Sequence, residues 1–123
     1  MTSEDVLVVN FNDYGSAAAL DEAFGNRWRY IGRAVRRHKM NASPLGNKFT
    51  VEKYGREDAI ERYRRWLWPQ LSQFEHSGES VSDAVEALLD MPEDVVLVCW
   101  CAPKACHGNV VKDALAWLKE TKG

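Results

Sequence analysis

The sequence predicts a small three-layer α/β domain, in which a short parallel or mixed sheet carries helices on both faces. Two short runs are wholly apolar, residues 6–9 (Val-Leu-Val-Val) and residues 95–98 (Val-Val-Leu-Val), as is typical of strands buried on both faces. Segments with helical spacing alternate with strands along the chain, which favours a sheet covered by helices. The 123 residues, of which 46% are hydrophobic and 11% aromatic, suit one domain spanning residues 1–123.

The first half of the chain predicts two short strands around one short helix. After the strand at residues 6–9, an alanine-rich stretch over residues 16–24 predicts a helix that ends at Gly25. Residues 27–31 alternate polar and apolar side chains, which favours a second strand, at an edge of the sheet. Residues 40–51 show no period, and their Pro and Gly indicate a tight, shaped loop.

The second half of the chain is mostly helical. A long helix is expected from Arg56 to Gly78, with Pro69 kinking or restarting it. A second helix follows, for which Ser80 and Asp83 are spaced like a capping pair. After the strand at residues 95–98, a final helix is predicted from about residue 108 to residue 121. The apolar positions of the long helix and the final helix are Ile60, Tyr63, Leu67, Leu71 and Phe74, and Val111, Ala114, Leu115 and Leu118.

Composition limits the partners and the location. The net charge is −2, so no global basic field attracts nucleic acid, and the basic stretch over residues 33–39 is interpreted as a solvated loop. No run approaches the roughly 18 apolar residues of a membrane helix. The first five residues are polar and acidic, unlike a signal peptide. We therefore expect a cytoplasmic protein that binds neither nucleic acid nor membrane.

The most distinctive chemistry lies between Cys99 and Gly108. This segment begins where the last strand ends and finishes where the last helix starts, a junction at which open α/β sheets bind ligands. Free amides at a helix N-terminus attract anions, and they lower the pKa of a thiol placed there. The first hypothesis is therefore an anion site in which Cys101, Cys106 or His107 supplies nucleophilic or acid–base character.

Two other hypotheses remain for the same segment. Cys99, Cys101, Cys106 and His107 are the right ligand types for zinc, but their spacing matches no common zinc pattern, so neither a metal nor another cofactor is expected. Alternatively, the cysteines pack as small hydrophobic side chains and His107 caps the helix. The three cysteines are not spaced like a secreted disulfide framework.

Two further segments offer polar groups to the same sheet edge. Gly32-Arg33 follows the second strand, where a guanidinium can bind a phosphate or carboxylate with two hydrogen bonds. Ser43-Pro44-Leu45-Gly46-Asn47 forms a loop whose glycine lets the backbone approach a ligand. Asn10 ends the first strand. An ordinary surface turn and a solvated arginine are the alternative. Motifs of P-loop proteins, serine hydrolases and zinc proteases are absent.

A family resemblance rests on motifs spread from about Val8 to Val111. The motifs are Asn10, Ile31-Gly32-Arg33, Ser43-Pro44-Leu45-Gly46-Asn47, Arg56, residues 60–66, and Cys99-Trp100-Cys101-Ala102-Pro103 with Cys106-His107-Gly108. Together they resemble the uncharacterised family called domain of unknown function 4326, found in phages and bacteria. The family usually has Pro where this chain has Lys48, and an acidic residue where it has Asn109. The resemblance implies a shared site formed by three loops, without an activity.

The expected function is binding of an anionic small molecule, with a nucleotide or nucleotide-derived ligand suiting both the anion site and Trp100, on which a flat ring can stack. This expectation includes an enzyme that cleaves a glycosidic or phosphate bond of that ligand at a pocket on the carboxyl edge of the sheet. The alternatives are a non-catalytic phage or bacterial protein that sequesters a signalling nucleotide, and a partner-binding module with a zinc-stapled cysteine–histidine cluster. Trp66 and Trp68 cannot both face one core, so at least one is expected to be exposed and to offer a surface for a partner or a homo-oligomer, with Trp66 expected by default in the core. The candidate catalytic residues are Cys101, Cys106 and His107, and the candidate ligand-binding residues are Asn10, Gly32, Arg33, Ser43, Gly46, Asn47, Arg56, Trp100 and Gly108.

Overall fold

A computed structural model describes residues 6–38, 40–79, 82–100 and 106–122. Three parallel strands form one sheet in the order β1-β3-β2. The strands are β1 (Leu7–Asn10), β2 (Trp28–Tyr30) and β3 (Val96–Cys99), and the helices are α1 (Ala17–Phe24), α2 (Val51–Tyr54), α3 (Arg56–Ser77), α4 (Asp83–Leu89) and α5 (His107–Lys122). No helix in the described ranges is long and apolar enough to cross a membrane.

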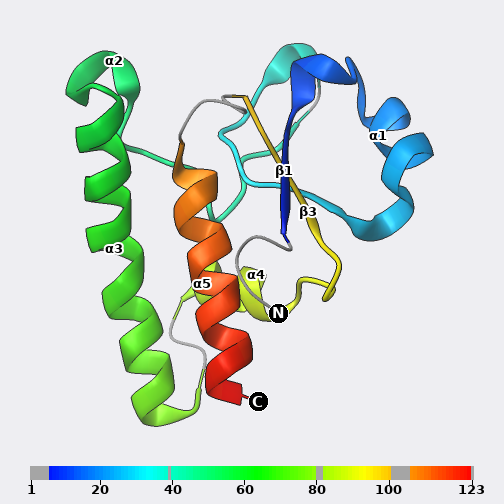
Figure 1. The fold of residues 1–123 in the computed structure, drawn as a ribbon. Coiled ribbons are helices and arrows are strands. Elements are labelled where there is room, and N and C mark those ends of the chain that lie inside the picture. Colours follow the sequence, from blue (N-terminus) through cyan, green and yellow to red (C-terminus); the bar gives the residue numbers. More distant parts are fainter. Residues whose placement is uncertain (1–5, 39, 80–81, 101–105, 123) are drawn as a thin grey trace.

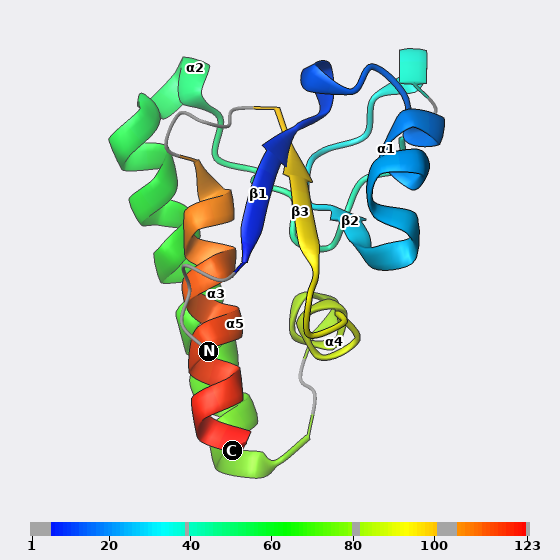
Figure 2. The same ribbon diagram turned by 45° about the vertical axis from the view of Figure 1, so that its right-hand side comes forward.

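The sheet has helices on both faces, as the sequence predicts. Alternate residues of β3 point to opposite sides: Leu97 and Cys99 join the larger core under α3, α4 and α5, whereas Val98 joins a smaller core with Phe11 and Leu20 of the α1 side. Figure 2 shows the strands between α1 on one side and α3 with α5 on the other. The strands all run in one direction, so their carboxyl ends share one edge.

Both long helices start at that edge of the sheet. Figure 1 shows α3 and α5 side by side, each beginning near α2 and running toward the opposite end, where the chain terminates. The first turn of α3 carries Glu57 and Asp58, which the positive end of the helix dipole favours. Gly78, in the left-handed conformation at φ 76°, ends the helix where the sequence predicts an end.

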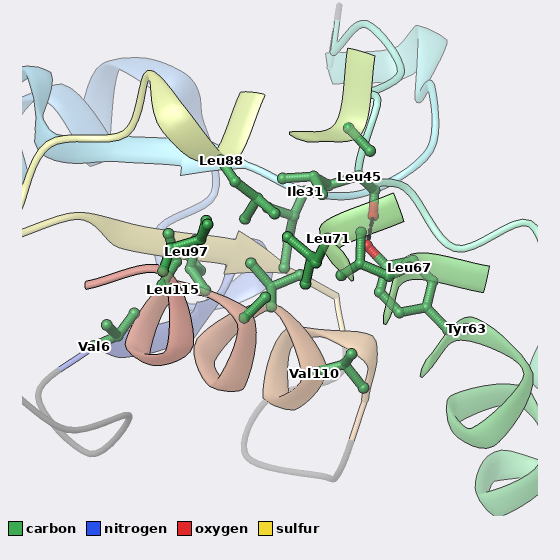
Figure 3. Close-up of a cluster of buried hydrophobic side chains, with 14 of the residues drawn as sticks. Val6, Ile31, Leu45, Tyr63, Leu67, Leu71, Leu88, Leu97, Val110 and Leu115 are labelled. Carbon is green, nitrogen blue, oxygen red and sulfur yellow. Dashed lines mark hydrogen bonds between the residues drawn. The ribbon is translucent and has the colours of Figure 1, made fainter. Parts of the chain in front are cut away.

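The larger core includes the apolar stripe of α3 and the buried side chains of α5 (Figure 3). Tyr63, Leu67 and Leu71 are fully buried, as their helical spacing predicts. Tyr63 is also tied by a hydrogen bond, because its hydroxyl donates to the Leu45 carbonyl at 2.6 Å. Burial raises the pKa of the Tyr63 hydroxyl far above its usual value, so the group stays a donor. This bond fixes the loop at residues 43–47 onto α3.

Several details of the sequence prediction are wrong. β1 is an edge strand with Leu7 51% exposed, because β3 alone takes the centre of the sheet. α3 runs without a break through Pro69. The N-cap of α4 is Ser82, whose hydroxyl accepts from the Val85 amide, and Ser80 lies outside the described residues.

The stretch after residue 50 and Trp68 also differ from expectation, whereas Trp66 packs on the core as expected. Thr50 caps a helical turn, α2, that ends at Gly55, where no helix is predicted. Neither Trp66 nor Trp68 is exposed. Both pack partly buried against the larger core, with Trp66 beside Tyr63 and Trp68 beside Trp117 at ring-centroid distances of 5.4 and 6.2 Å. The surface expected for a partner is therefore largely covered by the chain itself.

Tyr63→Phe should lower the free energy of unfolding by about 1–3 kcal/mol, because the buried Leu45 carbonyl loses its donor. Urea denaturation monitored by circular dichroism measures this loss. Tyr54→Phe is the matched control, since the Tyr54 hydroxyl has no hydrogen-bond partner within the described part of the chain. Equal effects of the two substitutions would show that the Tyr63–Leu45 bond does not stabilise the loop.

Candidate functional site

A pocket opens at the carboxyl edge of the sheet, between the start of α3, the start of α5 and the loop that follows β2. Its empty volume, counted to its open mouth, is about 550 Å³. The described lining residues are Gly32, Arg33, Asn47, Phe49, Thr50, Val51, Arg56, Ala59, Ile60, Trp100, Cys106 and His107. This is the edge at which ligands bind in open α/β sheets, and here two helices point their N-termini toward it.

The structure brings together most of the residues that the sequence singles out. Seven of them line the pocket, namely Gly32, Arg33, Asn47, Arg56, Trp100, Cys106 and His107. Gly108 is buried behind the wall, where an added Cβ would lie 3.2 Å from both the Cys106 sulfur and Val8. Cys101 lies outside the described residues. Asn10, Ser43 and Gly46 support the site without lining the pocket.

Asn10 positions Trp100 from the neighbouring strand. The two strand ends are in register, with Asn10 opposite Cys99. The Asn10 side-chain amide donates to the Trp100 carbonyl at 3.0 Å, and its oxygen accepts from the Asn12 backbone at 2.9 Å. Asn10 is therefore a structural link between the ends of β1 and β3, and the expected direct contact with a ligand has no support from its position.

Ser43 and Gly46 hold the loop against Gly32. The Ser43 amide donates to the Gly32 carbonyl at 2.9 Å, and the Gly46 amide donates to the Ser43 carbonyl at 2.9 Å. A Cβ on Gly46 would come within 2.9 Å of the Gly32 carbonyl oxygen, so only glycine allows the loop to approach this closely. The approach places Asn47 at the pocket wall, where its side-chain oxygen accepts from the Phe49 amide at 2.8 Å.

His107 forms the floor of the pocket and is 8% exposed. Its Nε2 lies 2.5 Å from the Ile31 carbonyl, and because a carbonyl only accepts, Nε2 carries the proton. Burial lowers the pKa of His107; the Ile31 hydrogen bond opposes this shift and the positive charge of Arg33 adds to it. The ring is therefore neutral near pH 7, with the acceptor lone pair on Nδ1. The Tyr63 ring packs edge-on against it at 5.0 Å between centroids.

Cys106 caps the start of α5 with its sulfur. The Gly108 amide donates to Cys106 Sγ at 3.3 Å, and the Asn109 amide donates to the Cys106 carbonyl at 3.0 Å. The thiol is 4% exposed and faces Cys99 of β3 at a sulfur–sulfur distance of 3.7 Å. Cys106 thus combines the helix-terminal position that the sequence predicts with a second thiol beneath it.

Trp100 is held in place on one side. Its ring packs on Phe11 with 4.7 Å between centroids, and its Nε1 donates to the Tyr30 hydroxyl at 2.7 Å. That hydroxyl in turn donates to the Arg33 carbonyl. Burial raises the pKa of Tyr30, so its hydroxyl stays protonated for this relay. The chain of bonds connects the end of β3 to the loop that carries Arg33.

Sequence reasoning missed the apolar side of the pocket. Phe49, Thr50 and Val51 line it from the turn that precedes and begins α2, and Ala59 and Ile60 line it from the first turns of α3. The long helix predicted from Arg56 implies that Ile60 faces inward, but the irregular stretch before it gives no such signal. The threonine that caps α2, followed five residues later by Gly55, is the pattern that could have revealed the turn.

Metal ligation has no support from the described residues. Within those ranges, no three histidine, cysteine or acidic side chains are grouped so that they could hold a metal ion. Cys101, one of the four residues weighed as zinc ligands, lies outside the ranges.

Comparison with known proteins places the chain in a family. It belongs to the family described as domain of unknown function (DUF4326), whose pattern matches residues 21–117. The match confirms the resemblance noted from the motifs and includes every candidate site residue except Asn10. No curated protein and no solved structure matches the chain. The family description names no activity, so the function must be argued from the pocket.

The buried histidine predicts a dependence of stability on pH. Because the pKa of His107 is lowered in the folded state, the unfolded chain takes up the proton at a higher pH than the folded protein does. The contribution of neutral His107 is therefore present above its unfolded-state pKa of about 6.5 and is lost as the pH falls through the folded-state pKa. We expect the free energy of unfolding to decrease from about pH 7 to about pH 5, and the decrease to be smaller in His107→Gln.

The matched control is His76→Gln, because His76 is exposed in the last turn of α3. This variant should keep the full decrease in urea denaturation across the same pH range. A decrease of the same size in His107→Gln and the wild type would contradict a neutral, buried His107.

Proposed function

We propose that the pocket binds an anionic small molecule that carries both a phosphate and a flat ring, such as a nucleotide or a nucleotide-derived ligand. The proposal rests on the positive charge of the pocket wall. Among its described lining residues only Arg33 and Arg56 are charged, and both are positive in a chain whose net charge is −2. Positive charge gathered in one pocket of an acidic protein is suited to an anionic ligand.

The geometry around the arginines also favours a phosphate. Arg33 follows β2, and Arg56 is the first residue of α3, so the two arginines that line the pocket come from different segments. A guanidinium binds phosphate oxygens with two parallel hydrogen bonds. Both α3 and α5 also point their N-termini toward this edge, and the partial positive charge of a helix N-terminus favours an anion. Neutral His107 adds no opposing charge at the pocket floor.

The rest of the lining suits an aromatic ring. Phe49, Ile60 and Trp100 give the pocket an apolar side beside its two arginines. The contacts of Trp100 with Phe11 and Tyr30 fix its ring before a ligand arrives, and a preorganised aromatic surface binds with a smaller entropic cost. A phosphate next to a flat ring is the combination found in nucleotides.

Binding without cleavage fits the pocket better than cleavage. Glycosidic bonds are usually cleaved by a pair of carboxylates, and the described lining residues include none. The candidate catalytic group with the best placement is His107, whose Nδ1 holds a lone pair. The proposal is therefore a binding protein, and sequestration of a signalling nucleotide, in a bacterium or during phage infection, is a role that such a protein could serve.

Arg33→Ala and Arg56→Ala should each raise the Kd for the preferred nucleotide by about tenfold or more, the effect of removing a hydrogen bond to a charged group. Isothermal titration with a panel of nucleoside mono- and diphosphates identifies that nucleotide and measures the loss. Arg65→Ala is the matched control, because Arg65 is an exposed α3 residue that pairs with Glu61. Failure of every panel member to bind the wild type, or equal weakening by Arg65→Ala, would overturn the proposal.

The preferred nucleotide should be recovered intact after long incubation with the protein, because a binding protein releases its ligand unchanged. Chromatography and mass spectrometry of the denatured mixture measure the recovery. Release of a free base, a nucleoside or phosphate, abolished in His107→Gln while binding persists, would instead establish cleavage with His107 as the acid–base group.

A further inference from the structure

Two thiols face each other behind the pocket wall. Cys106 Sγ donates to Cys99 Sγ at 3.7 Å, and neither sulfur is in a disulfide. The two cysteines come from the end of β3 and the start of α5, so the fold itself brings them together. A disulfide requires a sulfur–sulfur distance of about 2.05 Å, so the two sulfur atoms must move closer together for the bond to form.

The two thiols differ in how they can be reached. Both cysteines are buried in the larger core, Cys106 at 4% and Cys99 at 1% exposure, but only Cys106 lines the pocket. The Gly108 amide donates to Cys106 Sγ at 3.3 Å, a contact that stabilises the thiolate form of a sulfur at a helix N-terminus. A reagent that enters the pocket therefore meets Cys106 first, and Cys99 second.

We propose that Cys99 and Cys106 are a reversible redox modification site that takes a small-molecule disulfide as its oxidant. The Cys106 thiolate attacks one sulfur of the disulfide, forms a mixed disulfide and releases one small thiol. Cys99 then loses its proton and attacks the Cys106 sulfur, which forms the Cys99–Cys106 bond and releases the second small thiol. Two protein thiols are oxidised, and one small-molecule disulfide is reduced to two thiols.

The modification would change the pocket. Bringing Cys106 Sγ within bonding distance of Cys99 moves it away from its present position at the wall and weakens its contact with the Gly108 amide. That amide then loses its sulfur partner. An effect on ligand affinity follows only if the pocket binds the proposed anion, so that part rests on the proposed function, whereas formation of the disulfide does not.

The test uses the full-length folded chain with Cys101→Ser, which leaves Cys99 and Cys106 as its only thiols. After incubation with oxidised glutathione, the intact mass should fall by two hydrogen atoms and both free thiols should be lost. Trypsin cuts after Lys104, so a disulfide between the two cysteines joins the peptide of residues 66–104 to the peptide of residues 105–112. Dithiothreitol should restore both thiols.

Two further variants separate the roles of the thiols. Cys99→Ala in the Cys101→Ser background should stop at a mixed disulfide, one glutathione on Cys106, because the second attack is missing. Cys106→Ala in the same background should keep its single thiol, since Cys99 does not line the pocket. The proposal is overturned if folded Cys101→Ser keeps both thiols, or if Cys99 alone accepts glutathione in the folded protein. Neither readout involves a nucleotide, so failure here is distinct from failure of ligand binding.

Discussion

The hydrogen bond from His107 to the Ile31 carbonyl ties together the three segments on which the site depends. Ile31 directly follows β2, and its own amide donates to Val98 of β3 at 3.0 Å. His107 is the first residue of α5, so the 2.5 Å bond joins the start of that helix to the end of the sheet. The adjoining Gly32 carbonyl holds the loop at residues 43–47. This link helps to hold together the separate segments whose residues line the pocket.

This arrangement also determines the chemistry of the pocket. Burial lowers the pKa of His107 and keeps its ring neutral, so the positive charge at the pocket comes from the two arginines alone among the described lining residues. Cys106, the neighbour of His107 in sequence, is positioned by the same helix start and meets Cys99 beneath the wall. Anion binding and thiol chemistry thus depend on one strand-to-helix junction.

The sequence predicted the parts of the structure that follow from local pattern. The apolar run of β3, the stripe Tyr63, Leu67 and Leu71, and the stop at Gly78 all reflect backbone geometry and burial. The edge position of β1 was not predictable, because an apolar run does not reveal which strand takes the centre. The sequence predicts Ser43 and Gly46 as ligand contacts, yet in the structure they pack against Gly32. A glycine such as Gly46 allows close backbone packing as well as the approach of a ligand, and the sequence does not distinguish the two. The place of Phe49 in the pocket wall was not predictable either, because Phe49 lies in a stretch whose sequence shows no periodicity.

The most direct test of the central claim, an anion pocket at the carboxyl edge, is a nuclear magnetic resonance titration of ¹⁵N-labelled protein with the nucleotide that binds best. The account predicts that the largest amide shifts occur at residues that line the pocket, Arg33, Asn47, Arg56 and His107 among them. The opposite end of the sheet has an apolar groove between Leu88, Met91 and Leu115, which should not respond. Shifts centred on that groove, or no shifts with any nucleotide, would contradict the account.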